Sequence, residues 1–179
     1  MRAFKAEREL EVWATDRRGD PFTHVTTYKI CAASGVAGPK KAEGDGQVPE
    51  GFYTINLFNP RSSYHLSMRV SYPNRRDRAL RYTGSAIMIH GDCVSIGCLA
   101  MSDERIEELW VMNKALPEGE RADVHLFPGR DLAGMIERAR PRDPELAAFW
   151  TTLKRGNDAF EANHQLPVIR VKDGAYTVE

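Results

Sequence analysis

The sequence predicts a mainly β domain of the α+β class, built on a mixed β-sheet, with a helical extension at its C-terminus. Short segments of alternating apolar and polar residues, separated by turns with glycine and proline, fill the first 128 residues. The remaining segment instead repeats apolar side chains at helical spacing. We therefore divide the chain into a main domain, residues 1–128, and an extension, residues 129–179. The total of 179 residues suits one domain with an appendage.

Five strands are expected before residue 91. Residues 10–15 and 22–31 flank the turn Asp16–Asp20, a pattern typical of a hairpin. A long loop with five glycines and two prolines is expected at 34–51. The remaining strands are expected at 52–57, 65–72 and 85–90, the first of them ending at Asn59-Pro60.

Helices are expected mainly after residue 101. Ser102 is a good N-cap, and the acidic Asp103 and Glu104 suit the first turn of a helix that ends near residue 116. In the extension, helices are expected at 132–139 and 144–163, with Gly156-Asn157 as an interruption and Phe149, Trp150 and Phe160 packed on the sheet. The remaining expectations are a solvated loop at Arg75–Arg78, a strand at 122–127, and a hairpin of 168–171 and 175–178 turning at Asp173-Gly174.

Composition excludes some classes of protein. The 25 basic and 25 acidic residues give a formal net charge of zero, which argues against nucleic-acid binding through bulk charge. No apolar run approaches the ~20 residues that a membrane-spanning helix needs. The N-terminus has no apolar segment typical of a signal peptide, so the residues leave two alternatives open. The chain is either cytoplasmic, or exported with its signal removed.

The three cysteines, Cys31, Cys93 and Cys98, are an odd number, so a disulfide-stapled scaffold is not expected. Cys31 is expected to pack in a strand, and Cys93 to be a thiol packed within a loop. The alternative for Cys93 is a regulatory disulfide with Cys98, five residues further along the chain.

The segment between Ile87 and Met101 carries the strongest chemical signal. An apolar strand ends in His90-Gly91, and a short loop leads to Cys98. Free cysteine has a pKa of ~8.5, so a nearby histidine that accepts its proton makes it a better nucleophile. Gly97 leaves room beside the sulfur, and the N–H groups of Gly97 and Cys98 are candidates for an oxyanion hole. The segment therefore predicts Cys98 as a nucleophile and His90 as its general base.

Two other kinds of site fit less well. A zinc site of His65, His90, Cys93 and Cys98 lacks the spacing of known zinc motifs. A thiol–disulfide oxidoreductase would need Cys-x-x-Cys, which this sequence lacks. We expect no metal and no cofactor.

The motif resembles the L,D-transpeptidase catalytic domain family (YkuD-type), which acts on bacterial peptidoglycan. That family's His-Gly and Ser/Thr-His-Gly-Cys elements match His90-Gly91 and Ser95-x-Gly97-Cys98-Leu99-x-Met101. Pro49-Glu50-Gly51-x-Tyr53-x-Ile55 resembles a strand of the family. Asn59-Pro60, Tyr64–Ser67 and the run Cys-x-Ser-x-Gly-Cys-x-Ala-Met resemble its YafK-like branch. The likeness covers about residues 8–128, which would make the main domain an L,D-transpeptidase-like catalytic domain.

The resemblance implies a role for each matching residue. Cys98 is the nucleophile that forms a thioester with a peptidoglycan stem peptide, and His90 is the general base. The backbone carbonyl of Gly91 orients the histidine, and the Gly97 N–H lies at the reacting carbonyl. Ser95 matches the family's Ser/Thr and is placed in the substrate site. His65 and Tyr64 are also candidates for that site, or equally for surface positions on a strand.

Two departures concern the substrate. Where the family has histidine and arginine, this sequence has Ile96 and Ala100. Five arginines are candidates for the missing cation: Arg69, Arg75, Arg76, Arg78 and Arg81. The YafK-like branch shares these departures and is associated with hydrolysis of a lipoprotein–diaminopimelate link.

The resemblance therefore implies acyl transfer as the function, with two alternatives. The first is hydrolysis of a diaminopimelate-linked bond, either in an L,D cross-link or between a lipoprotein and peptidoglycan. The second is a non-catalytic peptidoglycan-binding module, which the intact Cys98 and His90 disfavour. Peptidoglycan stem peptides and a peptidoglycan-linked lipoprotein are the expected partners, and nucleic acid is not. The location implied is the periplasm or the cell wall.

Overall fold

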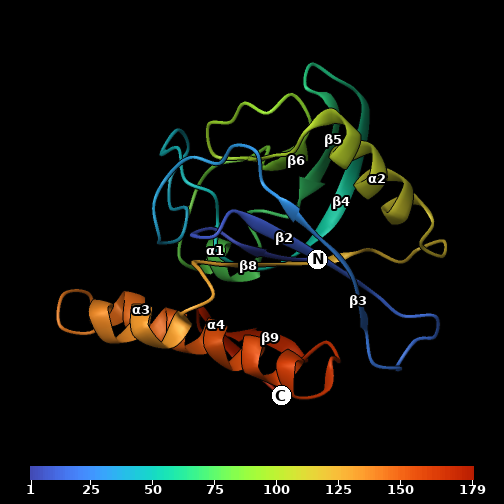
Figure 1. Ribbon diagram of the computed structural model, residues 1–179. Coiled ribbons are helices and arrows are strands. Elements are labelled where there is room, and N and C mark those ends of the chain that lie inside the picture. Colours follow the sequence, from blue (N-terminus) through green and yellow to red (C-terminus); the bar gives the residue numbers. More distant parts are fainter.

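A computed structural model describes all 179 residues and contains one large mixed sheet covered by helices (Figure 1). The sheet has eight strands in the order β3-β2-β1-β8-β4-β5-β6-β7. Its strands are β1 (Arg2–Phe4), β2 (Glu9–Ala14), β3 (Thr23–Lys29), β4 (Gly51–Ser62), β5 (His65–Val70), β6 (Met88–His90), β7 (Leu99–Ala100) and β8 (Asp123–Phe127). The helices are α1 (Arg75–Ala79), α2 (Asp103–Lys114), α3 (Leu132–Ala139) and α4 (Pro144–Asn163), and a separate hairpin joins β9 (Ile169–Lys172) and β10 (Ala175–Val178).

The sheet is mixed because two of its strand pairs are parallel. β1 runs parallel to β8, and β6 runs parallel to β7, whereas the other neighbours are antiparallel. The first parallel pair brings the chain's first strand beside a strand more than a hundred residues later. The expected mixed sheet and C-terminal helices are confirmed, and the sheet forms a half-barrel.

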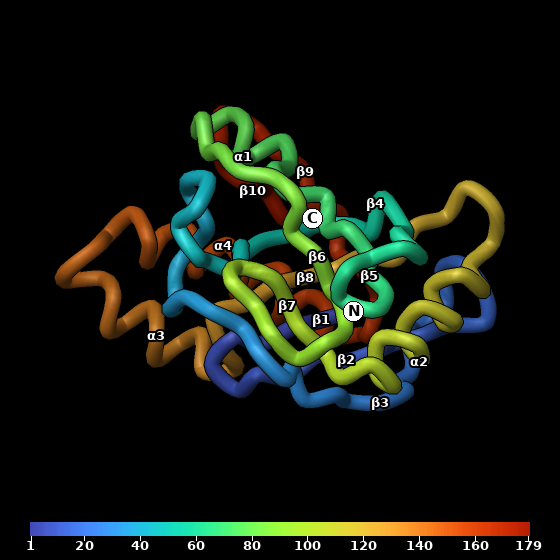
Figure 2. Tube along the Cα trace, turned by 90° about the horizontal axis from the view of Figure 1, so that it is seen from above, coloured from blue at the N-terminus to red at the C-terminus, as the bar shows by residue number.

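The two edges of this sheet meet. The segment that follows β3 pairs with β7 through an isolated antiparallel bridge between Ala32 and Ala100. The Ala100 N–H donates to the Ala32 carbonyl at 2.9 Å, and the Ala100 carbonyl accepts from the N–H groups of Cys31 at 2.8 Å and Ala32 at 3.2 Å. Figure 2 shows the segment after β3 passing beside β7. Closure in this way satisfies backbone groups that would otherwise be left on exposed edges.

Each face of the sheet packs on its own set of helices. One hydrophobic cluster lies between the strands and α2 and includes Leu10, Met68, Ile89, Leu99 and Ile106. The second cluster lies between β1, β4 and β8 on one side and α3, α4 and β10 on the other. Its members include Phe4, Phe52, Phe127, Trp150 and Leu153. In Figure 1, α2 lies on the opposite side of the sheet from α3 and α4.

A buried ion pair attaches the glycine-rich loop to the rest of the fold. Glu50 is fully buried and accepts from the Lys5 ammonium at 2.9 Å, the Gly38 N–H at 2.7 Å and the Trp150 indole at 2.7 Å. A buried carboxylate is tolerated when it is paired and hydrogen-bonded in this way. The contact ties β1, the loop at 34–51 and α4 together.

Most expected elements are present within a few residues of their predicted bounds. The hairpin of β2 and β3, the helices α2, α3 and α4, and the terminal hairpin all form. Asp173 and Gly174 have φ of 50° and 74°, as the predicted turn requires. Trp150 packs in the core between the extension and the sheet, as predicted, and so do Phe149 and Phe160.

Two expectations about secondary structure were wrong. β4 does not stop at Asn59-Pro60 but continues to Ser62, because the proline falls where the register with β5 shifts, and it therefore costs no ladder hydrogen bond. The run Arg75–Arg78 is not a solvated loop but part of α1. Asn74 and Asp77 form a capping box at its start, and Arg76 lies buried 3.9 Å from the centre of the Phe149 ring.

The expectation for two of the cysteines was also wrong. Cys31 and Cys93 form a disulfide, with 5.2 Å between their Cα atoms and 62 residues between them in sequence. Neither is therefore a packing thiol, and Cys93 does not pair with Cys98. Cys98 is the only free thiol. No helix in the structure is both long and apolar enough to cross a bilayer.

The expected interruption of α4 at Gly156-Asn157 does not occur, because Gly156 has a packing role instead. A Cβ at this position would lie 2.5 Å from Phe52 Cζ, so the helix approaches the sheet through its glycine.

We predict that Gly156→Ala lowers the free energy of unfolding by about 1–3 kcal/mol, because the methyl group overpacks the Phe52 contact. The measurement is urea denaturation of the variant and the wild type. Ala148→Gly, at an exposed position of the same helix, measures the effect of helix propensity alone. It is expected to lower the free energy of unfolding by about 1 kcal/mol. If Gly156→Ala instead stabilises the protein by that amount, the glycine has no packing role.

Candidate active site

Cys98 lies directly before β7, at the place where the two edges of the sheet meet. Its Sγ accepts from the Met88 N–H at 3.4 Å and donates to the Ala86 carbonyl at 3.7 Å. The residue is partly buried, and its thiol is the only one in the chain not in a disulfide. The strand pairing that forms the barrel therefore also holds the sulfur.

His90 ends β6, the strand next to Cys98. Its ring is buried, and Nδ1 lies 2.7 Å from the carbonyl oxygen of Gly91. A carbonyl only accepts, so Nδ1 carries the proton and donates, which leaves the lone pair of Nε2 free. The Tyr64 ring packs against the imidazole with 4.8 Å between ring centres. This is the tautomer that a general base requires.

The parallel pairing of β6 and β7 sets the relation between the two residues. Ile89 is opposite Leu99 and His90 is opposite Ala100, so Cys98 is level with Met88. Alternate residues of a strand share a face, which puts Met88 and His90 on one side of β6. No hydrogen bond joins the sulfur to the imidazole in this structure, where Sγ bonds to Ala86 and Met88 instead.

Burial keeps both groups neutral. It lowers the pKa of His90 below the usual 6.5, although the hydrogen bond to Gly91 and the charge of Asp92 act in the opposite direction. Burial also raises the pKa of the Cys98 thiol from its ordinary value, against smaller opposing effects of the Met88 N–H and the Lys40 charge. At neutral pH the resting site therefore holds a thiol and a neutral imidazole rather than an ion pair.

The N–H groups expected to form an oxyanion hole are already hydrogen-bonded. The Gly97 N–H donates to the Ser34 hydroxyl at 2.6 Å. The Cys98 N–H donates to the Ser95 hydroxyl at 2.9 Å, and that hydroxyl donates to the Cys98 carbonyl at 2.7 Å. Ser95 therefore closes the turn that leads into the cysteine. A substrate carbonyl must displace or share these hydroxyl groups to reach either N–H.

The other two predicted substrate residues are Tyr64, in the turn between β4 and β5, and His65, the first residue of β5. The Tyr64 carbonyl accepts from the Gly91 N–H at 3.1 Å, and its side chain is exposed beside His90. His65 instead turns toward α2, where its Nε2 lies 2.7 Å from a Glu107 carboxylate oxygen. Of this pair, the structure brings Tyr64 into contact with the imidazole.

None of the five candidate arginines lies against the thiol. Arg76 is buried against Phe149, Arg69 donates to Asn56, and Arg78 donates to the Pro73 carbonyl. The cation whose charge acts on Cys98 is Lys40. It is almost fully buried and donates to the Asp45 carboxylate at 2.7 Å and the Ala42 carbonyl at 2.8 Å. Its position in a glycine-rich loop gave no sequence signal.

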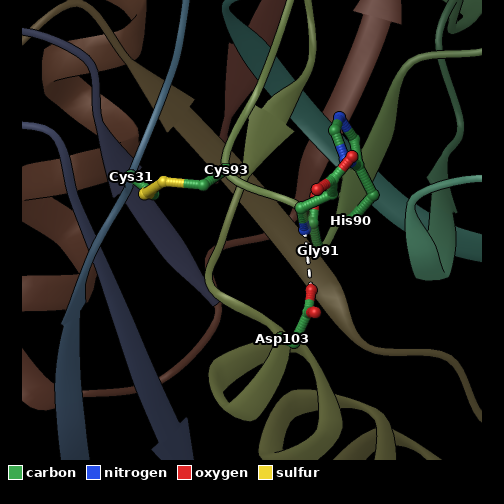
Figure 3. The surroundings of a disulfide bond; sticks show 6 residues. Cys31, His90, Gly91, Cys93 and Asp103 are labelled. Carbon is green, nitrogen blue, oxygen red and sulfur yellow. Dashed lines mark hydrogen bonds between the residues drawn. A yellow bond between two sulfur atoms is a disulfide. The ribbon is translucent and has the colours of Figure 1, made fainter.

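Ser34, Lys40 and Asp103 contact this region, but sequence analysis did not single them out for the site. The Asp103 carboxylate accepts from the Asp92 N–H at 2.8 Å and lies beside Gly91 (Figure 3). Figure 3 also shows the Cys31–Cys93 disulfide, whose Cys93 directly follows Asp92 in the chain. The disulfide removes Cys93 from the zinc alternative, and no group of three or more potential ligands lies together.

Comparisons with known proteins identify the family of this chain. The model of the YkuD L,D-transpeptidase catalytic domain matches residues 3–124. The Escherichia coli K12 protein named "Putative L,D-transpeptidase YafK" is 37% identical over 182 aligned positions, which cover 99% of this chain and 72% of that protein.

Solved structures share the fold at low sequence identity. The helical cell shape determining protein Pgp2 from Campylobacter jejuni superposes with a TM-score of 0.61 at 19% identity, covering 96% of this chain and 72% of that one. Bd1075 from Bdellovibrio bacteriovorus superposes with a TM-score of 0.51 at 19% identity, covering 96% and 74%. The family model spans most of the chain and the sequence relative spans nearly all of it, so this chain belongs to the YkuD-type L,D-transpeptidase catalytic domain family.

Proposed function

We propose that this protein catalyses cysteine-dependent acyl transfer on peptidoglycan stem peptides. The observation that carries the proposal is that one free thiol and one histidine of defined tautomer come from neighbouring parallel strands. Cys98 is the only cysteine outside a disulfide, and His90 on the adjacent parallel strand has Nδ1 held by the Gly91 carbonyl. Family membership supports the substrate class.

The first half-reaction forms a thioester. Sγ of Cys98 attacks the carbonyl carbon of the donor amide while its proton passes to Nε2 of His90. The tetrahedral intermediate collapses, the C–N bond breaks, and the leaving amine takes the proton from His90. The Gly91 carbonyl holds the imidazole in one orientation throughout. The Gly97 N–H contributes to oxyanion binding if the substrate oxygen displaces the Ser34 hydroxyl.

The second half-reaction decides between transfer and hydrolysis. An acceptor amine or a water molecule attacks the thioester, Nε2 accepts its proton, and the thiol is restored with that proton. An amine gives a new peptide bond, and water gives a shortened stem peptide. Hydrolysis of a diaminopimelate-linked bond, including a lipoprotein link, is the second candidate. Its support is that Ala100, small and buried, stands at the position of the family's arginine, a departure shared with the YafK-like branch that is associated with hydrolysis.

We assign catalysis to residues 1–128, with residues 129–179 as a supporting extension. Tyr64 is the best-placed candidate to contact substrate, since its exposed ring lies on the imidazole. Ser95 acts by shaping the turn before Cys98, and His65 is the least directly placed of the three because it is paired with Glu107.

The disulfide supports a location outside the cytoplasm. Disulfides form and persist in oxidising compartments and are rare in the reducing cytosol. Cys31 and Cys93 form such a bond near the candidate site. We therefore place the protein in the periplasm or at the cell wall, where peptidoglycan is found.

Cys98→Ala and His90→Ala are each expected to lower turnover of muropeptides by about 10³-fold or more. Each substitution removes a group that takes part chemically in both proposed half-reactions. The measurement is mass spectrometry of purified muropeptides, some carrying a lipoprotein remnant, after incubation with each protein. Thermal unfolding of the variants serves as the control for folding. Undiminished turnover by Cys98→Ala would rule out the thioester route.

The same experiment separates the two candidate reactions. A new cross-link or an exchanged amino acid that depends on Cys98 indicates a transferase. Loss of a residue, a cross-link or the lipoprotein remnant indicates a hydrolase. No change in any muropeptide would count against peptidoglycan as the substrate.

Alkylation of Cys98 by iodoacetamide is expected to be slow at pH 7–8 and to accelerate as the pH rises above 9. The reason is that burial raises the thiol pKa, and the thiolate is the reacting form. Mass spectrometry follows the uptake of label, and Cys98→Ala, which has no free thiol, is the control. A rate that is already maximal below pH 8 would reveal a preformed thiolate–imidazolium pair instead.

A further inference from the structure

The peptide group between Gly91 and Asp92 has hydrogen bonds on both sides. Its carbonyl oxygen accepts from Nδ1 of His90 at 2.7 Å, and its N–H donates to the Asp103 carboxylate at 2.8 Å. The carboxylate, the peptide and the imidazole thus form one continuous chain. Figure 3 shows the bond from the peptide N–H to the Asp103 carboxylate. Hydrogen bonds in such a chain polarise one another, so the carboxylate makes the carbonyl oxygen a stronger acceptor.

We propose that Asp103 is the positioning residue for the general base, acting on His90 through the Gly91–Asp92 peptide. This inference rests on the proposed function for its effect on turnover, but the geometry can be tested without any substrate. Asp103 would orient the imidazole and stabilise its protonated form, as a side-chain carboxylate does where it bonds a histidine directly.

The packing around Gly91 supports this role. A Cβ on Gly91 would lie 2.5 Å from Oδ1 of Asp103 and 3.1 Å from His65 Cβ and from Ile106 Cγ2. The carboxylate thus lies against the bare Cα of the residue after the histidine. Any side chain on Gly91 would displace it. The glycine in His-Gly has a physical reason here, which is room for Asp103.

The backbone beyond Gly91 needs such a constraint. Asp92 and Cys93 both have positive φ, 65° and 51°, a conformation that is uncommon for residues with a Cβ. Rotation of the preceding peptide would turn the Gly91 carbonyl away from His90. The bond from the Asp92 N–H to Asp103 opposes that rotation. Cys93 is held separately, by its disulfide and by its N–H donating to the Met101 carbonyl at 3.2 Å.

Asp103 is not occupied in capping its own helix. It is the first residue of α2, and the preceding N-cap residue, Ser102, makes no side-chain capping bond. A carboxylate at this end of a helix interacts favourably with the helix dipole. The next residue, Glu104, has the same charge at the same helix terminus but makes no bond to the Gly91–Asp92 peptide. It therefore provides a matched control.

The first test measures the imidazole itself. We expect Asp103→Asn to move the midpoint of the His90 titration, followed by NMR of the ring protons and assigned with His90→Gln, to lower pH than in the wild type. The other groups around the ring are Asp92 and Tyr64, with Cys98 directly before the adjacent strand β7 and the His65–Glu107 pair on β5 and α2. The substitution removes none of them. Glu104→Gln is expected to leave the midpoint unchanged.

The second test measures turnover. Asp103→Ala is expected to lower kcat on muropeptides about tenfold or more, with a smaller loss for Asp103→Asn, which keeps an acceptor oxygen. Glu104→Gln is expected to retain wild-type kcat. If Asp103→Asn leaves the His90 midpoint in place, or if Glu104→Gln moves it equally, the proposal is overturned. If the midpoint moves but neither the wild type nor any variant acts on muropeptides, the proposed function fails and the positioning role stands.

Discussion

Closure of the sheet between Ala32 and Ala100 is the constraint on which the site depends. β7 has only two residues and would not form a stable strand by itself. It is held on one side by β6 and on the other by the three hydrogen bonds at this closure. Cys98 is the residue directly before β7, so this closure, the seam between Ala32 and Ala100, fixes the sulfur beside Met88. The Cys31–Cys93 disulfide spans the same seam covalently.

The site that results is neutral at rest. Burial disfavours the charged form of both Cys98 and His90, and the buried cation nearby, Lys40, is held by Asp45. A neutral thiol reacts slowly with oxidants and disulfides, because the thiolate is the reactive species in both cases. In the proposed reaction the proton moves to Nε2 as the sulfur attacks, and the hydrogen bond at Nδ1 supports the charge that forms. In such a site the positioning of His90 matters more than a low thiol pKa.

Local pattern was enough to locate most of the elements and to single out the segment that holds His90 and Cys98 as a candidate site. The hairpin of β2 and β3, the helices after residue 101 and the His90–Cys98 segment all follow from residues close together in sequence. The features that escaped prediction depend on distant partners. β1 is recognisable only beside β8, β7 only beside Ala32, and the disulfide joins positions 62 residues apart. An odd number of cysteines argued against a disulfide framework but could not exclude one bond.

Distant partners also explain why the backbone groups of Gly97 and Gly91 have contacts that the local sequence did not predict. Gly97 was assigned its N–H as an oxyanion donor from the short motif alone, but the folded chain brings the Ser34 hydroxyl to that N–H from the segment after β3. Gly91 was assigned its carbonyl by resemblance, and the fold adds a carboxylate from α2 to the same peptide. Ser34 and Asp103 reach the loop at residues 91–98 from different elements, Ser34 from the segment after β3 and Asp103 from α2. The loop is thus held by long-range contacts at both ends, so its geometry depends on the folded half-barrel and not on the motif alone.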